Sequence, residues 1–87
     1  MSSSVAEANP LARDVAVSAT ELTVSLVDGR RISVPLAWYP RLLHASAEEL
    51  NHWEILGNGV GIRWPDLDED LSVAGILLGT RATKPQR

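Results

Sequence analysis

Short runs of alternating apolar and polar residues, two of them separated by Asp28-Gly29, constrain this chain most. Leu22, Val24 and Leu26 alternate with polar residues, and so do Ile32 and Val34. Such a period of two is typical of half-buried β-strands, and Asp-Gly between two of them predicts a hairpin. A two-residue loop would place apolar opposite polar side chains. A three-residue loop, 27–29, pairs Val24 with Ile32 and Leu22 with Val34, so that one face is apolar throughout. We therefore expect that register, with Gly29 left-handed.

The remaining segments predict short helices and two further strands. Val15 and Val17 indicate a strand before the hairpin, and strands are expected at 54–56 and 60–64. Gly57-x-Gly59-x-Gly61 precedes no helix, so it is typical of a turn rather than of a phosphate-binding loop.

Three local signals place the helices. Pro40 suits the first turn of a short helix, and Ser46 with Glu49 has capping-box spacing for a helix at about 47–53. Ser72 and Gly79 bracket a last helix at 73–78. The order β-β-β-α-β-β-α predicts an α+β fold with one antiparallel sheet of about five short strands and two or three short helices.

The size of the chain predicts a single domain. It has 87 residues and no cysteine, which excludes disulfides and thiolate metal sites. We expect a flexible leader at 1–13, one domain at 14–79 and a flexible basic tail at 80–87. The sequence contains no apolar run long enough to span a membrane and no export signal, so a cytoplasmic location is expected.

Charge is unevenly distributed along the chain. The net charge is −3, but residues 14–79 hold ten acids against four bases, and the two ends together carry a net +3. An acidic domain argues against direct binding of nucleic acid, which needs clustered Lys and Arg. The charge suits either solubility or a basic partner.

An acidic segment, formed by Asp66, Asp68, Glu69 and Asp70, is predicted to be a loop. Its spacing resembles the start of a calcium loop, but Leu71 and Leu77 occupy positions that require Gly and Glu. Two interpretations remain: the carboxylates favour the N-terminus of the last helix, or they face a partner. Their countercharge would come from Arg41 and Arg63, or from a basic partner.

No residues form a recognisable catalytic or metal-binding pattern. His44 and His52 lack a third ligand at metal spacing, and no nucleophile–base arrangement is evident. We therefore expect no enzyme activity, metal or cofactor. An enzyme would require a concave site that joins the acidic segment to Arg41, His44 or His52.

Three tryptophans and one tyrosine are the aromatic residues of the chain. Trp53, which follows a predicted helix, suits the core. Trp38, Tyr39 and Arg41 lie together beside Pro40, and such residues are enriched at binding hot spots. We weigh core packing against an exposed partner-binding site for these three.

Four longer runs carry a family resemblance: PLAWYPRL at 35–42, WEILGNGVGI at 53–62, WPDLDEDLSV at 64–73 and GILLG at 75–79. With Asp28-Gly29 before them, they resemble the small bacterial family catalogued as domain of unknown function 2442. The resemblance covers about residues 14–79 and implies a small α+β fold. It also implies relatives fused to helix-turn-helix domains, and relatives encoded beside a small protein of the domain of unknown function 4160 type. That gene pairing is similar to a toxin–antitoxin pair, with this chain as the antitoxin; no catalytic residues come with the resemblance.

Two functional hypotheses follow. In the first, the chain is a non-enzymatic interaction module, the antitoxin-like partner of a small protein encoded nearby. Its acidic segment would mask a basic patch on that protein, while Trp38 and Tyr39 anchor it. In the second, the chain is a regulatory or ligand-sensing homodimer.

Overall fold

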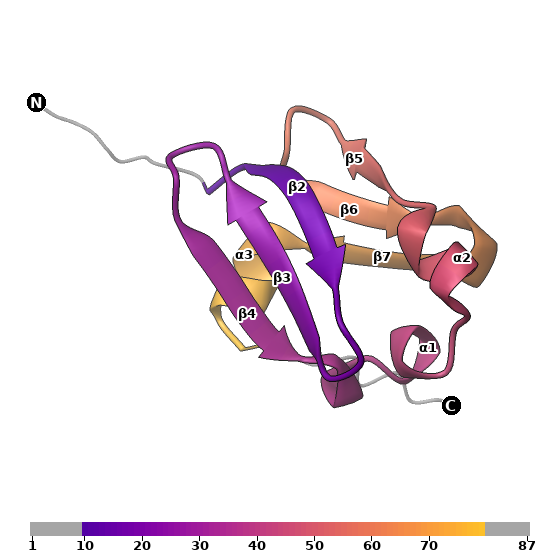
Figure 1. Ribbon diagram of the computed structural model, residues 1–87. Helices are drawn as coiled ribbons and strands as arrows, with labels where there is room; N and C mark the ends of the chain where they lie inside the picture. The colour runs from indigo at the N-terminus through magenta and orange to yellow at the C-terminus, as the bar shows by residue number, and fades with distance from the viewer. Residues whose placement is uncertain (1–9, 80–87) are drawn as a thin grey trace, which may run out of the picture.

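The first of two three-stranded antiparallel sheets contains the predicted hairpin (Figure 1). The computed structural model describes residues 10–79. This sheet has the order β2 (Ala12–Val17), β3 (Glu21–Leu26) and β4 (Arg31–Pro35). Val24 pairs with Ile32 and Leu22 with Val34, which confirms the predicted register. Gly29 has φ +99°, as a three-residue loop requires.

The second sheet has the order β5 (Glu54–Leu56), β6 (Gly61–Trp64) and β7 (Glu69–Ser72). The predicted α+β class is confirmed, but two sheets of three strands replace the single sheet of about five. Strand β7 lies where a loop was predicted. Its leucine, Leu71, pairs with the buried Ile62 of β6, so pairing with a core strand outweighs the weak strand preference of the acidic residues before it.

Short helices connect the strands. They are η1 (Leu36–Trp38), α1 (Pro40–Leu43), α2 (Ala47–Asn51), η2 (Pro65–Leu67) and α3 (Val73–Leu77). The capping box is present: the Glu49 amide donates to Ser46 Oγ at 3.1 Å, and the Ser46 amide donates to Glu49 Oε1 at 2.9 Å. Helix α2 ends at Asn51, two residues before the predicted end. Ser72 Oγ accepts from the Gly75 amide at 2.9 Å and caps α3 as expected.

A backbone hydrogen bond ties the start of β2 to the turn between β5 and β6. The Ala12 amide donates to the Gly59 carbonyl at 2.7 Å. Gly59 has φ +119°, and a Cβ placed there would lie 2.7 Å from the Ala12 carbonyl oxygen. Glycine is therefore needed here both for its backbone conformation and for the close approach of the two segments of the chain.

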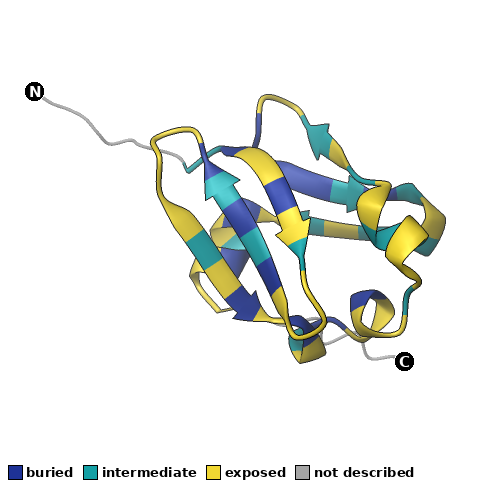
Figure 2. Cartoon of the chain, in the orientation of Figure 1, coloured by how far each residue is buried: buried dark blue, intermediate teal, exposed yellow. Residues whose placement is uncertain are grey.

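The core lies between the sheets and the helices and is entirely apolar apart from two polar side-chain tips (Figure 2). Trp64 of β6 is fully buried, and its indole Nε1 donates to the Leu50 carbonyl of α2 at 3.1 Å. Tyr39 is 1% exposed, and its hydroxyl is the second polar group. The other buried residues are Ala12, Val15, Leu22, Val24, Leu26, Val34, Leu36, Leu42, Ile62, Val73 and Ile76.

The predicted ends of the domain can be compared with the structure only in part. Strand β2 begins at Ala12, so the last residues of the predicted leader 1–13 belong to the first sheet. Residues 1–9 and the predicted tail 80–87 lie outside the described residues. None of the helices in residues 10–79 has the length and apolar character needed to span a bilayer.

Candidate functional site

The acidic segment is not the loop that was predicted. Asp66 lies in η2, Asp68 has the left-handed conformation with φ +53°, and Glu69 and Asp70 begin β7. Helix α3 starts after Ser72 and has no acidic residue in its first turn. The interpretation that these carboxylates stabilise the N-terminus of the last helix is therefore wrong.

Residues of the same domain supply the countercharge of this segment. Arg63 Nη1 lies 3.2 Å from Asp70 Oδ1, across the β6–β7 pair. Arg41 Nη1 lies 3.7 Å from Glu69 Oε1 and donates to the Asp68 carbonyl at 2.6 Å. Both arginines that the sequence offered as internal partners thus bind the segment and offset part of its negative charge.

His52 adds a third contact to the acidic segment. Its Nδ1 lies 2.7 Å from Asp66 Oδ2, and both side chains are about half exposed to solvent. The hydrogen bond that His52 donates to the Asp66 carboxylate, together with the negative charge of that carboxylate, raises the pKa of His52. This contact ties the end of α2 to η2.

The predicted aromatic anchor is divided between core and surface. Tyr39 is buried, so it is a core residue and not a surface contact; burial, with the nearby Glu69 charge, raises its pKa. Trp38 is partly buried and packs against the core, and so does Trp53, as predicted. Arg41 is half exposed but engaged with Asp68 and Glu69. Trp38, Tyr39 and Arg41 therefore do not form one exposed binding surface.

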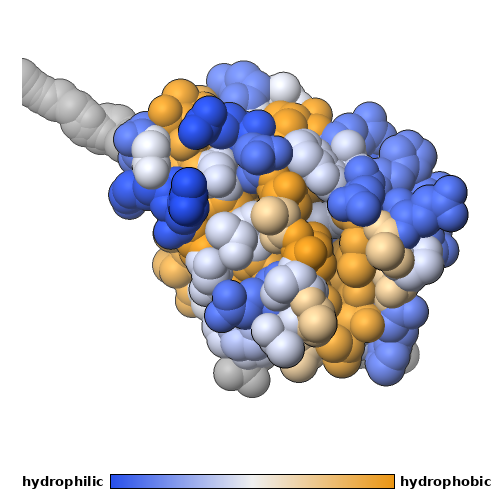
Figure 3. All heavy atoms as spheres, in the orientation of Figure 1, coloured by the Kyte–Doolittle hydropathy of each residue, from blue (hydrophilic) through white to orange (hydrophobic). Residues whose placement is uncertain are grey.

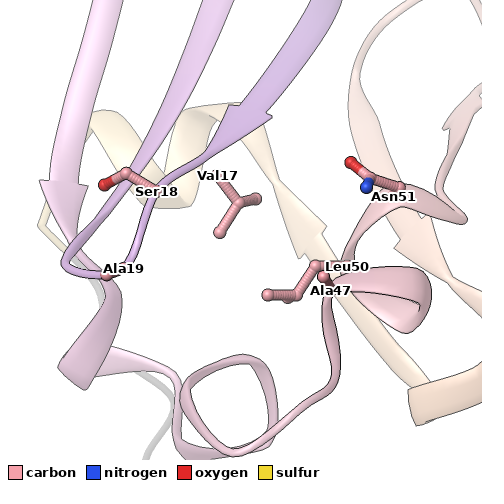
Figure 4. A pocket seen from close by; sticks show the side chains of 6 residues that line it. All are labelled: Val17, Ser18, Ala19, Ala47, Leu50 and Asn51. Carbon is pink, nitrogen blue, oxygen red and sulfur yellow. The ribbon is translucent and has the colours of Figure 1, made fainter.

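A groove lies between the end of β2 and helix α2. It has a volume of about 260 Å³ and is lined by Val17, Ser18, Ala19, Ala47, Leu50 and Asn51. Val17 and Leu50 point into the space between β2 and α2 (Figure 4). Figure 3 shows apolar surface between the first sheet and the α1–α2 segment, with hydrophilic residues on both sides.

Both elements that form the walls of the groove were predicted from the sequence. The alternation at Val15 and Val17 predicts β2, and the Ser46 cap predicts α2. Nothing in the sequence placed the two elements opposite each other, so none of the lining residues was among the predicted site residues. The Trp64–Leu50 hydrogen bond, between residues 14 apart in the chain, helps to position α2 there.

Comparison with protein families decides the relationship that the sequence suggested. The family model described as "Protein of unknown function (DUF2442)" matches residues 12–82. The chain belongs to the DUF2442 family. No curated protein sequence matches it significantly.

Two solved structures are similar to this DUF2442 domain. A protein of unknown function from Rhodospirillum rubrum is 35% identical, with a TM-score of 0.73 over 86% of this chain and 93% of that one. An uncharacterized protein from Chromobacterium violaceum is 26% identical, with a TM-score of 0.70 over 82% of this chain and 67% of that one. The fold of this DUF2442 domain is thus shared with solved proteins whose descriptions assign no activity.

Proposed function

We propose that this DUF2442 domain is a non-enzymatic protein-interaction module that binds a small partner protein, as an antitoxin binds its toxin. The observation that supports this proposal is the apolar groove between β2 and α2. Its walls come from the end of β2 with the turn that follows it and from helix α2, an arrangement that suits a segment of another protein.

The size and lining of the groove support a polypeptide occupant. Its volume of about 260 Å³ is below the range of roughly 300–1,000 Å³ typical of small-molecule sites. The lining side chains are small, and Asn51 and Ser18 supply polar groups at its margins. A groove of this kind accepts one or two side chains and the backbone of a partner segment.

The charge around the groove supports a basic partner. Glu48 is exposed and follows the lining residue Ala47 in sequence, and Glu21 is exposed and pairs with the lining residue Ser18. This surface, rather than the acidic segment 66–70, forms the electrostatic part of the proposed interaction, because Arg41, His52 and Arg63 already engage three carboxylates of that segment. Masking would then act by steric cover of the partner and by attraction of its basic residues.

Co-purification with the product of the neighbouring gene tests the proposal. Wild-type protein is expected to retain that product at micromolar concentration. Ala47→Arg, which places a long cationic side chain in the groove, is expected to lose it. Ala74→Arg is the matched control, because Ala74 is also exposed in the first turn of a short helix but lies on α3. Absence of any complex with wild-type protein, or equal binding by both variants, would contradict the proposal.

A further inference from the structure

The turn between β5 and β6 presents an asparagine followed by glycine, the dipeptide in which an asparagine side chain deamidates most readily. Of the other two asparagines, Asn9 precedes Pro10, which has no amide N–H, and Asn51 precedes the bulkier His52. Asn58 precedes a glycine, whose amide nitrogen can approach the side chain without a Cβ in the way. Asn58 is exposed, and within residues 10–79 no hydrogen bond engages its side chain.

Deamidation at such a dipeptide is a ring closure within the chain. The Gly59 amide nitrogen loses its proton and attacks the side-chain carbonyl carbon of Asn58, and ammonia leaves, which gives a cyclic succinimide. Water then opens the ring at one of its two carbonyls. Opening at one of them gives aspartate. Opening at the other gives isoaspartate, whose main chain runs through the former side chain and is longer by one methylene. Water is the only other reactant.

Three hydrogen bonds hold the backbone that must move before this ring can close. The Gly59 amide donates to the Leu56 carbonyl at 3.1 Å, and the Val73 amide donates to the carbonyl of Val60 at 3.0 Å. The Ala12 amide donates to the Gly59 carbonyl at 2.7 Å, a contact that we call the Gly59 junction. The attacking nitrogen is therefore itself a bound donor, and the turn and the junction must open before it can lose its proton and rotate.

The hairpin between β3 and β4 contains a similar dipeptide, Asp28-Gly29, whose side chain is held differently. An aspartate closes the same ring through its protonated carboxyl, from which water leaves. Asp28 Oδ1 accepts from the Arg30 amide at 3.0 Å, and Oδ2 accepts from Arg30 Nε at 2.8 Å. The hydrogen bond from the Arg30 amide, with that from its side chain, lowers the pKa of Asp28. This carboxylate therefore stays ionised, and the reactive dipeptide is Asn58-Gly59.

We propose that Asn58 is a modification site, at which deamidation follows opening of the Gly59 junction and leaves an isoaspartate that prevents the junction from closing again. The longer main chain of isoaspartate cannot keep both the Gly59–Leu56 hydrogen bond and the close approach to Ala12. Even a Cβ placed on Gly59 would lie 2.7 Å from the Ala12 carbonyl oxygen. The aspartate product keeps the length of the main chain and adds only a charge at an exposed position. This inference is independent of the proposed partner groove.

Mass spectrometry of the full chain, kept at mildly alkaline pH, tests whether the fold controls the reaction. One sample is kept folded and one in urea, and fragmentation assigns each amide-to-acid change to Asn58 or Asn51. We expect Asn58 to deamidate at least about tenfold more slowly in the folded chain, because the reaction waits for opening. In urea Asn51 is expected to react more slowly than Asn58, because His52 carries a Cβ. Equal rates at Asn58 in the two samples, or no deamidation in urea, would overturn the proposal.

Two glycine variants locate the opening that limits the reaction. Gly57→Ala strains the turn at Asn58, where φ is +59°, and Gly29→Ala strains the hairpin turn, where φ is +99°. Neither new Cβ meets an atom closer than 3.5 Å, and both variants keep Asn58-Gly59. We expect Gly57→Ala to accelerate both deamidation of Asn58 and hydrogen exchange of the Gly59 amide about fivefold, and Gly29→Ala to change neither. Equal acceleration by both variants would assign the reaction to global unfolding and overturn control by the junction.

The isoaspartyl product tests whether the opening is irreversible. This form, separated by chromatography, is expected to exchange the Gly59 and Ala12 amides at least about tenfold faster than the unmodified protein. Asn58→Asp has the same charge on a main chain of normal length, so it is expected to keep the protection of both amides. Protection retained in the isoaspartyl form would overturn the proposal. Equal loss of protection in Asn58→Asp would also overturn it, since charge alone would then open the junction.

Discussion

His52 and Asp66 form one of three contacts that engage the acidic segment within the domain. The three contacts made by His52, Arg41 and Arg63 bind acidic residues or backbone of that segment to α2, α1 and β6. The His52–Asp66 and Arg63–Asp70 pairs are exposed to about half, and such surface pairs each contribute only about 0–1 kcal/mol to the free energy of unfolding. Their main effect is to orient the segment and to reduce the repulsion among its carboxylates.

The His52–Asp66 pair predicts a pH dependence of stability. Since the folded-state pKa of His52 is raised, the pair stabilises the fold fully below the unfolded-state pKa of about 6.5, and this contribution is lost as pH rises through the folded value. Asp66→Asn is expected to bring the pKa of His52 down and to flatten this dependence. Titration of the imidazole signals by NMR, with urea unfolding from pH 5.5 to 8.5, measures both. An unchanged titration of His52 in the variant would contradict the pairing.

Trp64 is the residue on which the position of α2 depends most directly. Trp64→Phe removes the donor to the Leu50 carbonyl and leaves a cavity in a fully buried site. We expect a loss of about 2–3 kcal/mol in the free energy of unfolding. Trp53→Phe, at a partly buried site, is the matched control and should cost less; urea denaturation of both variants gives the comparison. Equal losses of unfolding free energy in the two variants would contradict a stabilising role of the Trp64–Leu50 hydrogen bond.

At the scale of elements, α2 is a five-residue helix that needs its cap. Isolated helices of this length are not stable in water, so α2 depends on the capping box and on packing of Leu50 against the core. The same helix forms one wall of the groove. The proposed site therefore depends on the same capping box that stabilises α2.

Loss of the cap gives an element-scale prediction. Ser46→Ala is expected to lower the free energy of unfolding by about 1 kcal/mol, because the Glu49 amide loses its acceptor. Glu49→Gln keeps an acceptor for the Ser46 amide and should cost a few tenths of a kcal/mol. Chemical denaturation compares the two, and a Ser46→Ala cost no larger than that of Glu49→Gln would contradict the role of the cap.

At the scale of the whole molecule, two small sheets share one core and meet at one narrow junction. The Ala12–Gly59 contact and the side chains buried between the sheets hold them together. Because the two segments approach so closely at Gly59, this junction fixes where the start of β2 lies against the turn between β5 and β6.

Two glycine substitutions test the junction. Gly59→Ala is expected to cost about 3 kcal/mol or more, since it combines a positive φ with a Cβ 2.7 Å from the Ala12 carbonyl oxygen. Gly29→Ala also has a positive φ, but its Cβ would meet nothing within 4 Å, so it should cost about 1 kcal/mol. Urea unfolding gives the difference, and similar costs would show that the close approach at Gly59 is readily relaxed.

Local sequence patterns predict the α+β class, the register of the β3–β4 hairpin, both serine caps and the turn at Gly57–Gly61. Each of these depends on residues close together in the chain, where alternation, capping and turn preferences act directly. The family resemblance was likewise carried by the sequence and is confirmed by the family model.

The division into two sheets, the strand β7, the burial of Tyr39 and the groove depend on contacts between residues far apart in the chain. Glu69 and Asp70 have weak strand preference, and they form β7 because β6 offers a ladder and Arg63 a positive charge. Tyr39 was a candidate surface anchor because short-range patterns do not reveal which face of a turn meets the core. The groove depends on the hydrogen bond from Trp64 to Leu50, which helps to position α2 opposite the end of β2, and local spacing does not encode that contact.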